Sequence, residues 1–156
     1  MILSLLRHAE AEPWSDGDFS RVLTEKGRAQ SVAVGAFIRK KRIQPEVIVT
    51  SPVVRAVQTA EIVAKELEMG APVVESFLAC GMTNETAFDA LSAYKELHSV
   101  MFVGHEPDFS NFVAAALGAA AASCINLRKA SLTQLQFSKT KAGAATLEFF
   151  IPVRYL

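Results

Sequence analysis

The amino-acid sequence predicts an α/β fold, a three-layer sandwich in which a mostly parallel central sheet lies between two layers of helices. Short runs rich in β-branched and apolar residues alternate with amphipathic stretches, as they do in βαβ units. The chain has 156 residues, of which 51% are hydrophobic. A chain of this size buries roughly 68–70% of its extended surface and needs neither disulfides nor a structural metal. We therefore expect residues 1–156 to form one domain.

Four strands are expected in the first two thirds of the chain, at residues 2–6, 46–50, 72–75 and 100–103. Between the first two strands, Thr24 is a typical helix N-cap, and apolar residues recur after it at helical spacing as far as Phe37. The basic run at residues 39–42 suits the C-terminal end of this helix, where the helix dipole is negative. The order strand, helix, strand is that of a parallel crossover.

The remaining elements continue the alternation. Three more helices are predicted, at residues 54–69 with Gly70 as the stop, at residues 85–97 with Asn84 as the N-cap, and after Pro107. Residues 132–137 and 145–150 are expected to form a closing pair of strands, joined by a turn at residues 139–143.

Charge and hydropathy exclude several classes of function. Sixteen Lys and Arg balance sixteen Asp and Glu, so the formal net charge is zero and we expect no nucleic-acid partner. No stretch offers the ~20 strongly apolar residues that span a bilayer, and we expect no membrane partner. The apolar start of the chain meets Arg7 at once, unlike a signal peptide, which predicts a cytoplasmic protein.

The only two cysteines, Cys80 and Cys124, lie far apart, in neither a CxxC pair nor a zinc-ligand spacing. We expect both to be reduced and buried as small apolar residues. No metal site is predicted, because two histidines without a third ligand at a recognisable spacing fall short of a catalytic metal centre.

Polar residues follow three of the predicted strands at the point where each strand ends. These residues are Arg7 and His8 after the first strand, Ser51 and Arg55 after the second, and Gly104 and His105 after the fourth. In an open α/β sheet, ligands bind outside the carboxyl ends of the parallel strands. We therefore expect these side chains to face one crevice.

Two histidines and two arginines in one crevice require a negative partner. A bound phosphoryl group is one such partner, because the planar fork of Arg matches phosphate oxygens and each charge-assisted hydrogen bond contributes roughly 1.5–3 kcal/mol. The alternative is a surface ion network with nearby carboxylates, for which the sequence offers Glu10, Glu12, Asp18 and Glu106.

A neutral imidazole attacks phosphorus and carries a phosphoryl group covalently. Guanidinium charges favour the neutral form of a neighbouring histidine, whose unperturbed pKa is about 6.5. We expect His8 to be this nucleophile, with Arg7 and Arg55 binding the phosphate. His105 would donate a hydrogen bond to an equatorial oxygen as charge develops.

Three segments taken together indicate a protein family more specifically than any one of them does. "LLRHAEAE", "TSPVVRAVQTAEIV" and "VGHEP", at the ends of the first, second and fourth strands, resemble the histidine phosphatase superfamily over residues 5 to about 117. The resemblance implies a phosphoglycerate mutase-like fold and a metal-independent phosphatase without a cofactor. It also implies a phosphorylated His8, with Arg7, Arg55 and His105 completing the phosphate pocket.

The short chain, the segment "DFSRVLTEKGRAQ" and the form "VGHEP" most resemble the SixA branch of phosphohistidine phosphatases. Only 49 residues separate Arg55 from His105, where larger branches carry a long insertion. The resemblance implies a role in signal transduction. It also implies a phosphohistidine-bearing protein, such as a phosphotransfer domain, as the partner, and inorganic phosphate as the product.

Two departures from the superfamily pattern bear on the chemistry. Ala9 stands where the signature has Gly, and Leu78-Ala79-Cys80 stands where mutase-like branches carry a proton-donating Glu. An alkoxide leaving group normally needs a general acid, whereas the imidazole of phosphohistidine can be protonated from solvent. The missing acid therefore favours a phosphohistidine substrate.

Several alternatives remain open from the sequence. Asp18 and Glu85 are conceivable proton donors but are assigned as caps or surface charges, and Arg21 either guides an acidic partner or pairs with Asp18. Trp14 either lines the mouth of the crevice or packs its loop. Two alternatives to a phosphohistidine phosphatase remain open. The chain is a phosphomonoesterase for small metabolites, or it is a module that binds phosphorylated ligands without turnover.

Overall fold

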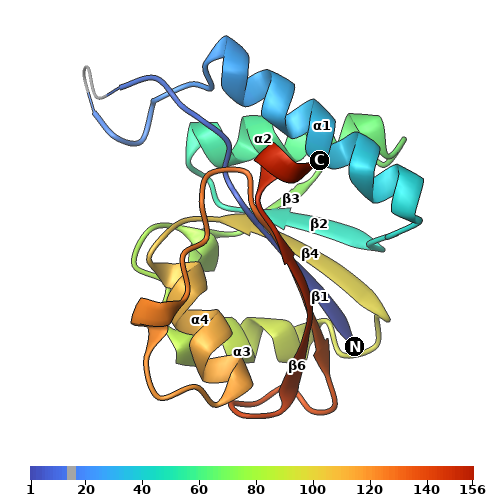
Figure 1. Cartoon of the computed structure of the whole chain (residues 1–156), viewed down its shortest axis with the longest axis vertical. Coiled ribbons are helices and arrows are strands. Elements are labelled where there is room, and N and C mark those ends of the chain that lie inside the picture. Colours follow the sequence, from blue (N-terminus) through green and yellow to red (C-terminus); the bar gives the residue numbers. More distant parts are fainter. Residues whose placement is uncertain (14–16) are drawn as a thin grey trace.

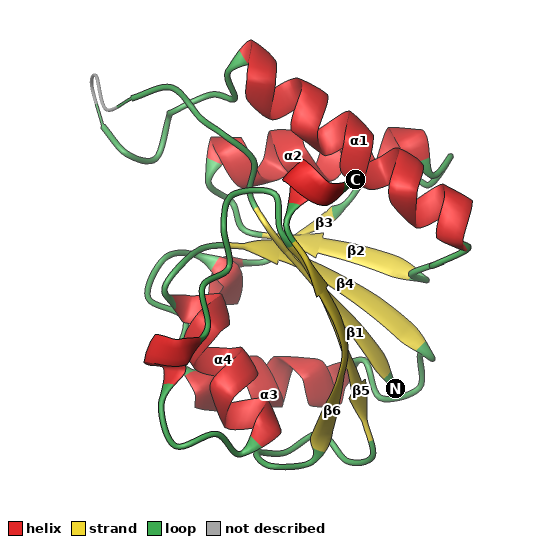
Figure 2. Cartoon of the chain, viewed as in Figure 1, coloured by secondary structure: helices red, strands yellow, loops and turns green. Residues whose placement is uncertain are grey.

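Six strands form one twisted sheet with helices on both faces, as Figures 1 and 2 show. The computed structural model describes residues 1–13 and 17–156. The strand order is β3-β2-β4-β1-β5-β6. The strands span β1 (Ile2–Arg7), β2 (Val47–Thr50), β3 (Val73–Val74), β4 (Ser99–Gly104), β5 (Leu132–Phe137) and β6 (Ala145–Ile151). Strands β3, β2, β4 and β1 pair in parallel, and β5 pairs antiparallel with both β1 and β6.

Four helices make the outer layers of the sandwich. They are α1 (Glu25–Lys41), α2 (Val54–Glu66), α3 (Asn84–Ala93) and α4 (Asp108–Leu117). In Figure 2, α1 and α2 cover one face of the sheet, and α3 and α4 cover the other. The predicted three-layer α/β sandwich with a mostly parallel sheet is confirmed.

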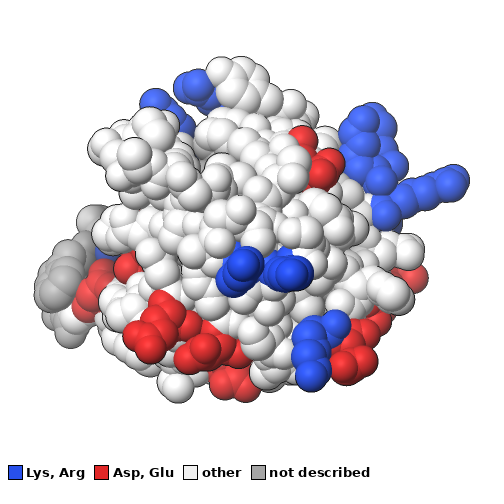
Figure 3. Space-filling view, turned by 90° about the horizontal axis from the view of Figure 1, so that it is seen from below, with Lys and Arg blue, Asp and Glu red and all other residues white. Residues whose placement is uncertain are grey.

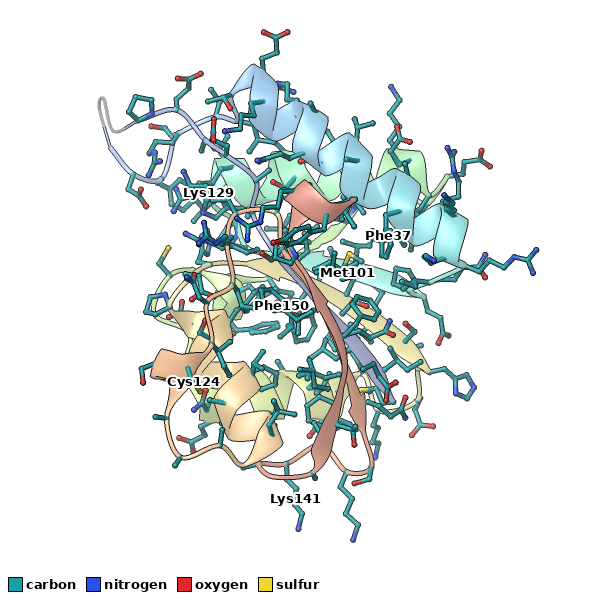
Figure 4. The ribbon with its side chains drawn as sticks, viewed as in Figure 1. Phe37, Met101, Cys124, Lys129, Lys141 and Phe150 are labelled. Carbon is teal, nitrogen blue, oxygen red and sulfur yellow. The ribbon has the colours of Figure 1, made fainter. Side chains whose placement is uncertain are left out.

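The central strands are apolar on both faces because helices cover both faces. Along β4, Val100 and Phe102 belong to the core on the α3 and α4 side, while Met101 and Val103 belong to the core on the α1 and α2 side. Figure 4 labels Met101 on the same side of the sheet as Phe37 of α1. Six consecutive buried residues thus anchor β4 in the middle of the sheet.

The ends of two helices differ from the expectation. Helix α2 ends at Glu66 rather than at residue 69, and the chain reverses at Glu68 with a φ of 56°. Helix α3 ends at Ala93, because the residues after it form tighter turns of the i to i−3 type. Its N-cap is Thr83, whose hydroxyl accepts a hydrogen bond from the Thr86 amide at 3.2 Å, so the assignment of the cap to the following asparagine was wrong.

The first helix begins as predicted. The Thr24 hydroxyl oxygen accepts a hydrogen bond from the Gly27 amide at 3.0 Å. The Thr24 amide donates to the Glu10 carbonyl at 3.1 Å. A Cβ on Gly27 would lie 1.9 Å from that carbonyl oxygen. The start of α1 therefore rests directly on the backbone that follows β1.

Two surface properties complete the description of the fold. Figure 3 views the molecule from the side of α3, α4 and the β5–β6 turn, where acidic and basic side chains both occur and uncharged residues cover most of the surface. Within residues 1–13 and 17–156, no helix combines the length and apolar character needed to cross a membrane.

The close approach at Gly27 generates a test of the packing. We expect Gly27→Ala to lower the free energy of unfolding by about 2 kcal/mol, because the added methyl group must push the Glu10 carbonyl away. Urea unfolding measures this change. The matched control is Gly70→Ala, where a Cβ meets no atom within 4 Å, and its stability should be unchanged or slightly higher. Equal stabilities for both variants would contradict the packing.

Candidate active site

The strand register brings the two histidines to neighbouring points on the sheet edge. Arg7 at the end of β1 is aligned with Gly104 at the end of β4, so His8 and His105 leave adjacent strands side by side. The His8 amide donates to the Gly104 carbonyl at 3.0 Å. Strands β1 and β4 are followed by helices on opposite faces, which makes this edge a topological switch point of the kind where α/β sheets bind ligands.

Three of the expected site residues meet in one buried cluster. The ring centroids of His8 and His105 lie 5.3 Å apart with the planes inclined at 54°. The two imidazoles are 6% and 2% exposed, respectively, and the Arg55 side chain is buried beside them. Arg55 reaches the cluster from the first turn of α2. The fourth expected residue, Arg7, lies half-buried at the same edge.

The contacts of His8 fix which ring nitrogen carries the hydrogen. Nδ1 lies 2.7 Å from the Ala9 carbonyl oxygen, which only accepts hydrogen bonds, so the hydrogen is on Nδ1. Nε2 accepts a hydrogen bond from Arg55 Nε at 3.1 Å, so Nε2 carries the lone pair. Burial, helped by the charge of Arg55, lowers the pKa of His8 to about 3. His8 is therefore neutral, and the lone pair on its Nε2 faces a guanidinium group.

His105 is held through a serine at the end of the neighbouring strand. Its Nε2 lies 2.7 Å from the Ser51 hydroxyl, and that hydroxyl oxygen accepts from the Val53 amide at 3.2 Å. Burial, followed by the charge of Arg55, lowers the pKa of His105 to about 4. The Ser51 hydroxyl has no other acceptor among the described residues, so we assign its hydrogen to Nε2, which leaves the imidazole hydrogen on Nδ1. That nitrogen is buried and finds no partner among the residues that the structure describes.

Asp18 supplies the counter-charge of Arg55. Arg55 Nη1 donates to the Asp18 backbone carbonyl at 2.7 Å, and Nη2 donates to its carboxylate at 2.9 Å. The other carboxylate oxygen accepts from Arg21 Nη1 at 2.8 Å. Hydrogen bonding from Arg21, together with the pair to Arg55, holds the pKa of Asp18 below its usual range. Part of the expected ion network therefore exists, and it lies within the site.

The sequence predicts Asp18 as a cap, a surface charge or a member of an ion network beside the crevice, and the last of these agrees with the structure. Only the pairing of Asp18 with Arg21, three residues apart, has a visible sequence signal, and it was one of the two alternatives considered for Arg21. The contact between Asp18 and Arg55 joins a loop to a helix 37 positions away, which no local pattern predicts.

Arg7 is anchored by the last third of the chain, where the sequence offered no motif. Its Nη1 donates to the Leu127 carbonyl at 2.7 Å, and its Nε is buried without a partner in the described part of the chain. Burial lowers the pKa of Arg7, and the nearby charge of Glu106 opposes this shift. The Ala130 amide lies 3.1 Å from the Arg7 carbonyl and 3.2 Å from the His8 carbonyl, and so holds this backbone from the other side.

Both cysteines are exposed, so the expectation that they are buried was wrong. The Cys80 sulfur lies 3.8 Å from Arg55 Nη2, at the rim of the cluster. Asp108, the first residue of α4, fixes this rim by accepting hydrogen bonds from the Gly81 amide at 2.8 Å and the Met82 amide at 3.2 Å. Although the residue as a whole is exposed, partial desolvation at this rim raises the pKa of the Cys80 thiol, which therefore keeps its proton at neutral pH. Cys124 ends the short 3-10 helix Ala122–Cys124, and Figure 4 labels it beside α4.

Other expected residues lie outside the cluster. Glu85 is exposed in the first turn of α3. Trp14 lies outside the residues that the structure describes. Over residues 1–13 and 17–156, no three His, Cys, Asp or Glu side chains gather in the way that metal ligands do.

The assembled cluster suits a tetrahedral oxyanion. Two neutral imidazoles and the Arg55 guanidinium group lie together, and Arg7 is near enough for its charge to act on both histidines. Among the described residues, one carboxylate, that of Asp18, pairs directly with Arg55. Donors remain free on Arg7 and on His105 Nδ1, while His8 Nε2 carries an electron pair. Groups of these types can bind a phosphoryl group and attack phosphorus.

Comparisons with known proteins agree with this chemistry. The family described as the histidine phosphatase superfamily (branch 1) matches residues 3–78. A protein of Picosynechococcus sp. described as uncharacterized is 31% identical over 95% of this chain and 89% of its own. The protein histidine phosphatase SixA complexed with tungstate shares the fold with a TM-score of 0.90 at 20% identity, over 99% of both chains. The SixA protein of Agrobacterium tumefaciens has a TM-score of 0.84 at 25% identity, over 97% of both chains.

The lowered pKa values of His8 and His105 predict how stability depends on pH. Below about pH 6.5 the unfolded chain protonates both histidines, whereas the folded protein resists protonation until about pH 4 for His105 and about pH 3 for His8. The free energy of unfolding should therefore fall as the pH drops from 7.5 to 5, by about 2 kcal/mol for each histidine. Urea unfolding at both pH values measures the fall.

The control for this experiment is the double variant His8→Asn, His105→Asn. It retains the other titrating groups, including the exposed His98, and should lose much less stability over the same pH interval. An equal loss in the two proteins would mean that the two imidazoles titrate as they do in water.

Proposed function

The chain belongs to the histidine phosphatase superfamily, and we propose that it is a phosphohistidine phosphatase that works through a phosphorylated His8. The observation that carries the proposal is the arrangement of His8 itself. Its Nδ1 hydrogen is committed to the Ala9 carbonyl, and its Nε2 lone pair lies among cationic groups. One solved structure that shares the fold is the protein histidine phosphatase SixA complexed with tungstate, a tetrahedral oxyanion like phosphate.

Arg55 has the capacity to bind phosphate without losing Asp18. A guanidinium group carries five N–H donors, and the contacts to His8, Asp18 and the Cys80 sulfur engage four of them. One Nη1 donor is left for a phosphoryl oxygen, and the long Nη2 contact to the sulfur, at 3.8 Å, is weak enough for a second oxygen to replace it. Arg7 adds its Nε, which has no partner among the described residues. Asp18 holds the guanidinium plane in position, which reduces the entropy lost when the phosphate binds.

The proposed reaction has two steps. In the first, Arg55 Nε–H turns from His8 Nε2 to a phosphoryl oxygen, and the freed lone pair of Nε2 attacks phosphorus in line. A new P–N bond forms, the P–N bond to the substrate imidazole breaks, and that imidazole keeps the proton it takes from solvent. The Ala9 carbonyl stabilises the positive charge that His8 then carries, because it accepts from Nδ1. His105 Nδ1 donates to an equatorial oxygen. In the second step, water attacks phospho-His8 and releases inorganic phosphate, which returns the lone pair to Nε2.

The protonation states around the site favour phosphohistidine over phosphate esters. An ester oxygen normally leaves with a proton from a general acid. Cys80 has a raised pKa and is a weak acid, and Asp18 is ionised because two arginines hold its carboxylate. The imidazole of phosphohistidine needs no acid from the protein, since it takes a proton from solvent. A phosphotransfer domain is thus the proposed class of partner.

A panel of substrates tests the proposal. We expect release of phosphate from a phosphohistidine phosphotransfer domain at least ~100-fold faster than from phosphoserine, phosphotyrosine or small phosphoesters, because the ester reactions lack a general acid worth roughly 10²- to 10⁴-fold. The His8→Ala variant should release none. Activity should persist in excess chelator, since no step uses a metal.

Acid quenching of the working enzyme should trap a phosphate that is acid-labile and alkali-stable on His8. Binding of the phosphorylated domain without release would identify a phospho-ligand binding module. Faster turnover of sugar or nucleotide phosphates would identify a small-molecule phosphomonoesterase.

A second test concerns the serine that orients His105. We expect Ser51→Ala to lower kcat about 10-fold with little change in KM, since the loss of an oriented transition-state donor costs at most roughly 10²- to 10³-fold. The ¹⁵N signals of His105 should show a mixture of the two neutral forms in this variant. The control is Ser131→Ala, a buried serine whose hydroxyl has no partner in the described chain. A kcat that falls equally in both variants would show that the effect is one of packing.

A further inference from the structure

The loop between β1 and α1 presents apolar side chains to solvent beside the phosphate pocket. Phe19 is 57% exposed and Val22 is 42% exposed, and we call these two residues the loop patch. In Figure 1 this loop projects from the body of the molecule at the end where α1 and α2 begin. Exposed apolar groups beside a polar site are typical of surfaces that bind another protein.

The loop patch is held by ordered backbone contacts. The Phe19 carbonyl accepts a hydrogen bond from the Val54 amide at 3.2 Å, and the Val22 carbonyl accepts from the Glu12 amide at 2.9 Å. The next residue, Leu23, is buried and its amide donates to the Gln58 side chain at 2.8 Å. The backbone on both sides of the patch is thus tied to the protein, while the two side chains point outward. A rigid, exposed aromatic side chain loses little entropy when a partner covers it.

The loop patch is continuous with the reacting centre. Asp18, next to Phe19, holds Arg55 through its carbonyl and its carboxylate, and Val54, which holds the Phe19 carbonyl, precedes Arg55 in α2. A phosphoryl group bound by Arg55 would therefore lie next to Asp18, the residue that precedes Phe19. A small phosphorylated metabolite would leave the patch uncovered, whereas a protein that carries the phosphoryl group on its surface would cover it.

Other exposed apolar groups lack this connection to the site. Tyr155 is 67% exposed but lies at the C-terminus, where the Arg154 guanidinium stacks on its ring at 4.7 Å from the centroid. Val73 and Val74 form the edge strand β3, and Leu147 and Phe150 lie on the opposite edge strand β6. Among the exposed apolar residues, Phe19 directly follows Asp18, the residue that holds Arg55, and is therefore the one most directly connected to the site.

We propose that Phe19 and Val22 form a docking surface for the protein that carries the phosphohistidine, and that they bind an apolar area of that protein next to its phosphorylated side chain. This inference rests on the proposed function and names how its substrate is recognised. Aromatic anchors dominate the binding energy of protein interfaces. Phe19 thus contributes to the affinity for the protein substrate and makes no contribution to the bond-breaking steps.

The test compares a protein substrate with a small one. We expect Phe19→Ser to raise KM for a phosphorylated phosphotransfer domain about 10-fold, as loss of an aromatic anchor does. Turnover of phosphoramidate, which contains the same P–N bond without a protein, should stay within twofold of the wild type. The matched control is Tyr155→Ser, another exposed aromatic residue, which should change neither reaction.

Binding without turnover separates this proposal from the proposed function. The dissociation constant of the His8→Ala variant for the phosphorylated domain should rise about 10-fold when Phe19→Ser is added. An unchanged constant, or an equal loss with both substrates, would overturn the docking surface while leaving the phosphatase assignment intact. Wild-type protein that binds the domain through Phe19 but releases no phosphate would instead overturn the proposed function.

Discussion

The His8 imidazole lies between a carbonyl group, which can only accept a hydrogen bond, and a guanidinium group, which can only donate one. The Ala9 carbonyl fixes the hydrogen on Nδ1, and Arg55 Nε–H fixes the lone pair on Nε2. Burial then makes protonation costly, so the ring stays neutral where a free histidine would be charged. The same guanidinium group is held by Asp18 and is positioned to bind a phosphoryl oxygen. One arginine thus fixes the neutral form of His8, the proposed nucleophile, and is also proposed to bind the phosphoryl group that His8 attacks.

This arrangement depends on the register of two strands and on packing from both sides. Alignment of Arg7 with Gly104 places His8 and His105 next to each other. The start of α1 supports the backbone after His8 through Gly27, and Ala130 supports it from the C-terminal third of the chain. Figure 4 labels Lys129, the residue before Ala130, at this end of the sheet. Loops that carry reactive groups are held by such contacts, because the strands alone fix only where the loops begin.

The sequence predicts the fold well because the alternation of apolar strands and amphipathic helices is local. It also predicts which side chains follow the strand ends, and the structure brings His8, Arg55 and His105 together there. Contacts made by loop closure are not predictable in this way. The pairing of Asp18 with Arg55, the support of Arg7 by Leu127 and the exposure of Cys80 all depend on segments distant in sequence. The ends of α2 and α3 differ because tight turns follow them, which periodicity does not distinguish from helix.

The most direct measurement is the ¹⁵N NMR spectrum of the His8 imidazole between pH 8 and pH 5, assigned by comparison with His8→Asn. We expect a neutral ring throughout, with the hydrogen on Nδ1 and an unprotonated Nε2 that hydrogen-bonds to Arg55. A ring that becomes charged near pH 6.5, or one that carries its hydrogen on Nε2, would contradict the assignment of His8 as a nucleophile prepared by Ala9 and Arg55.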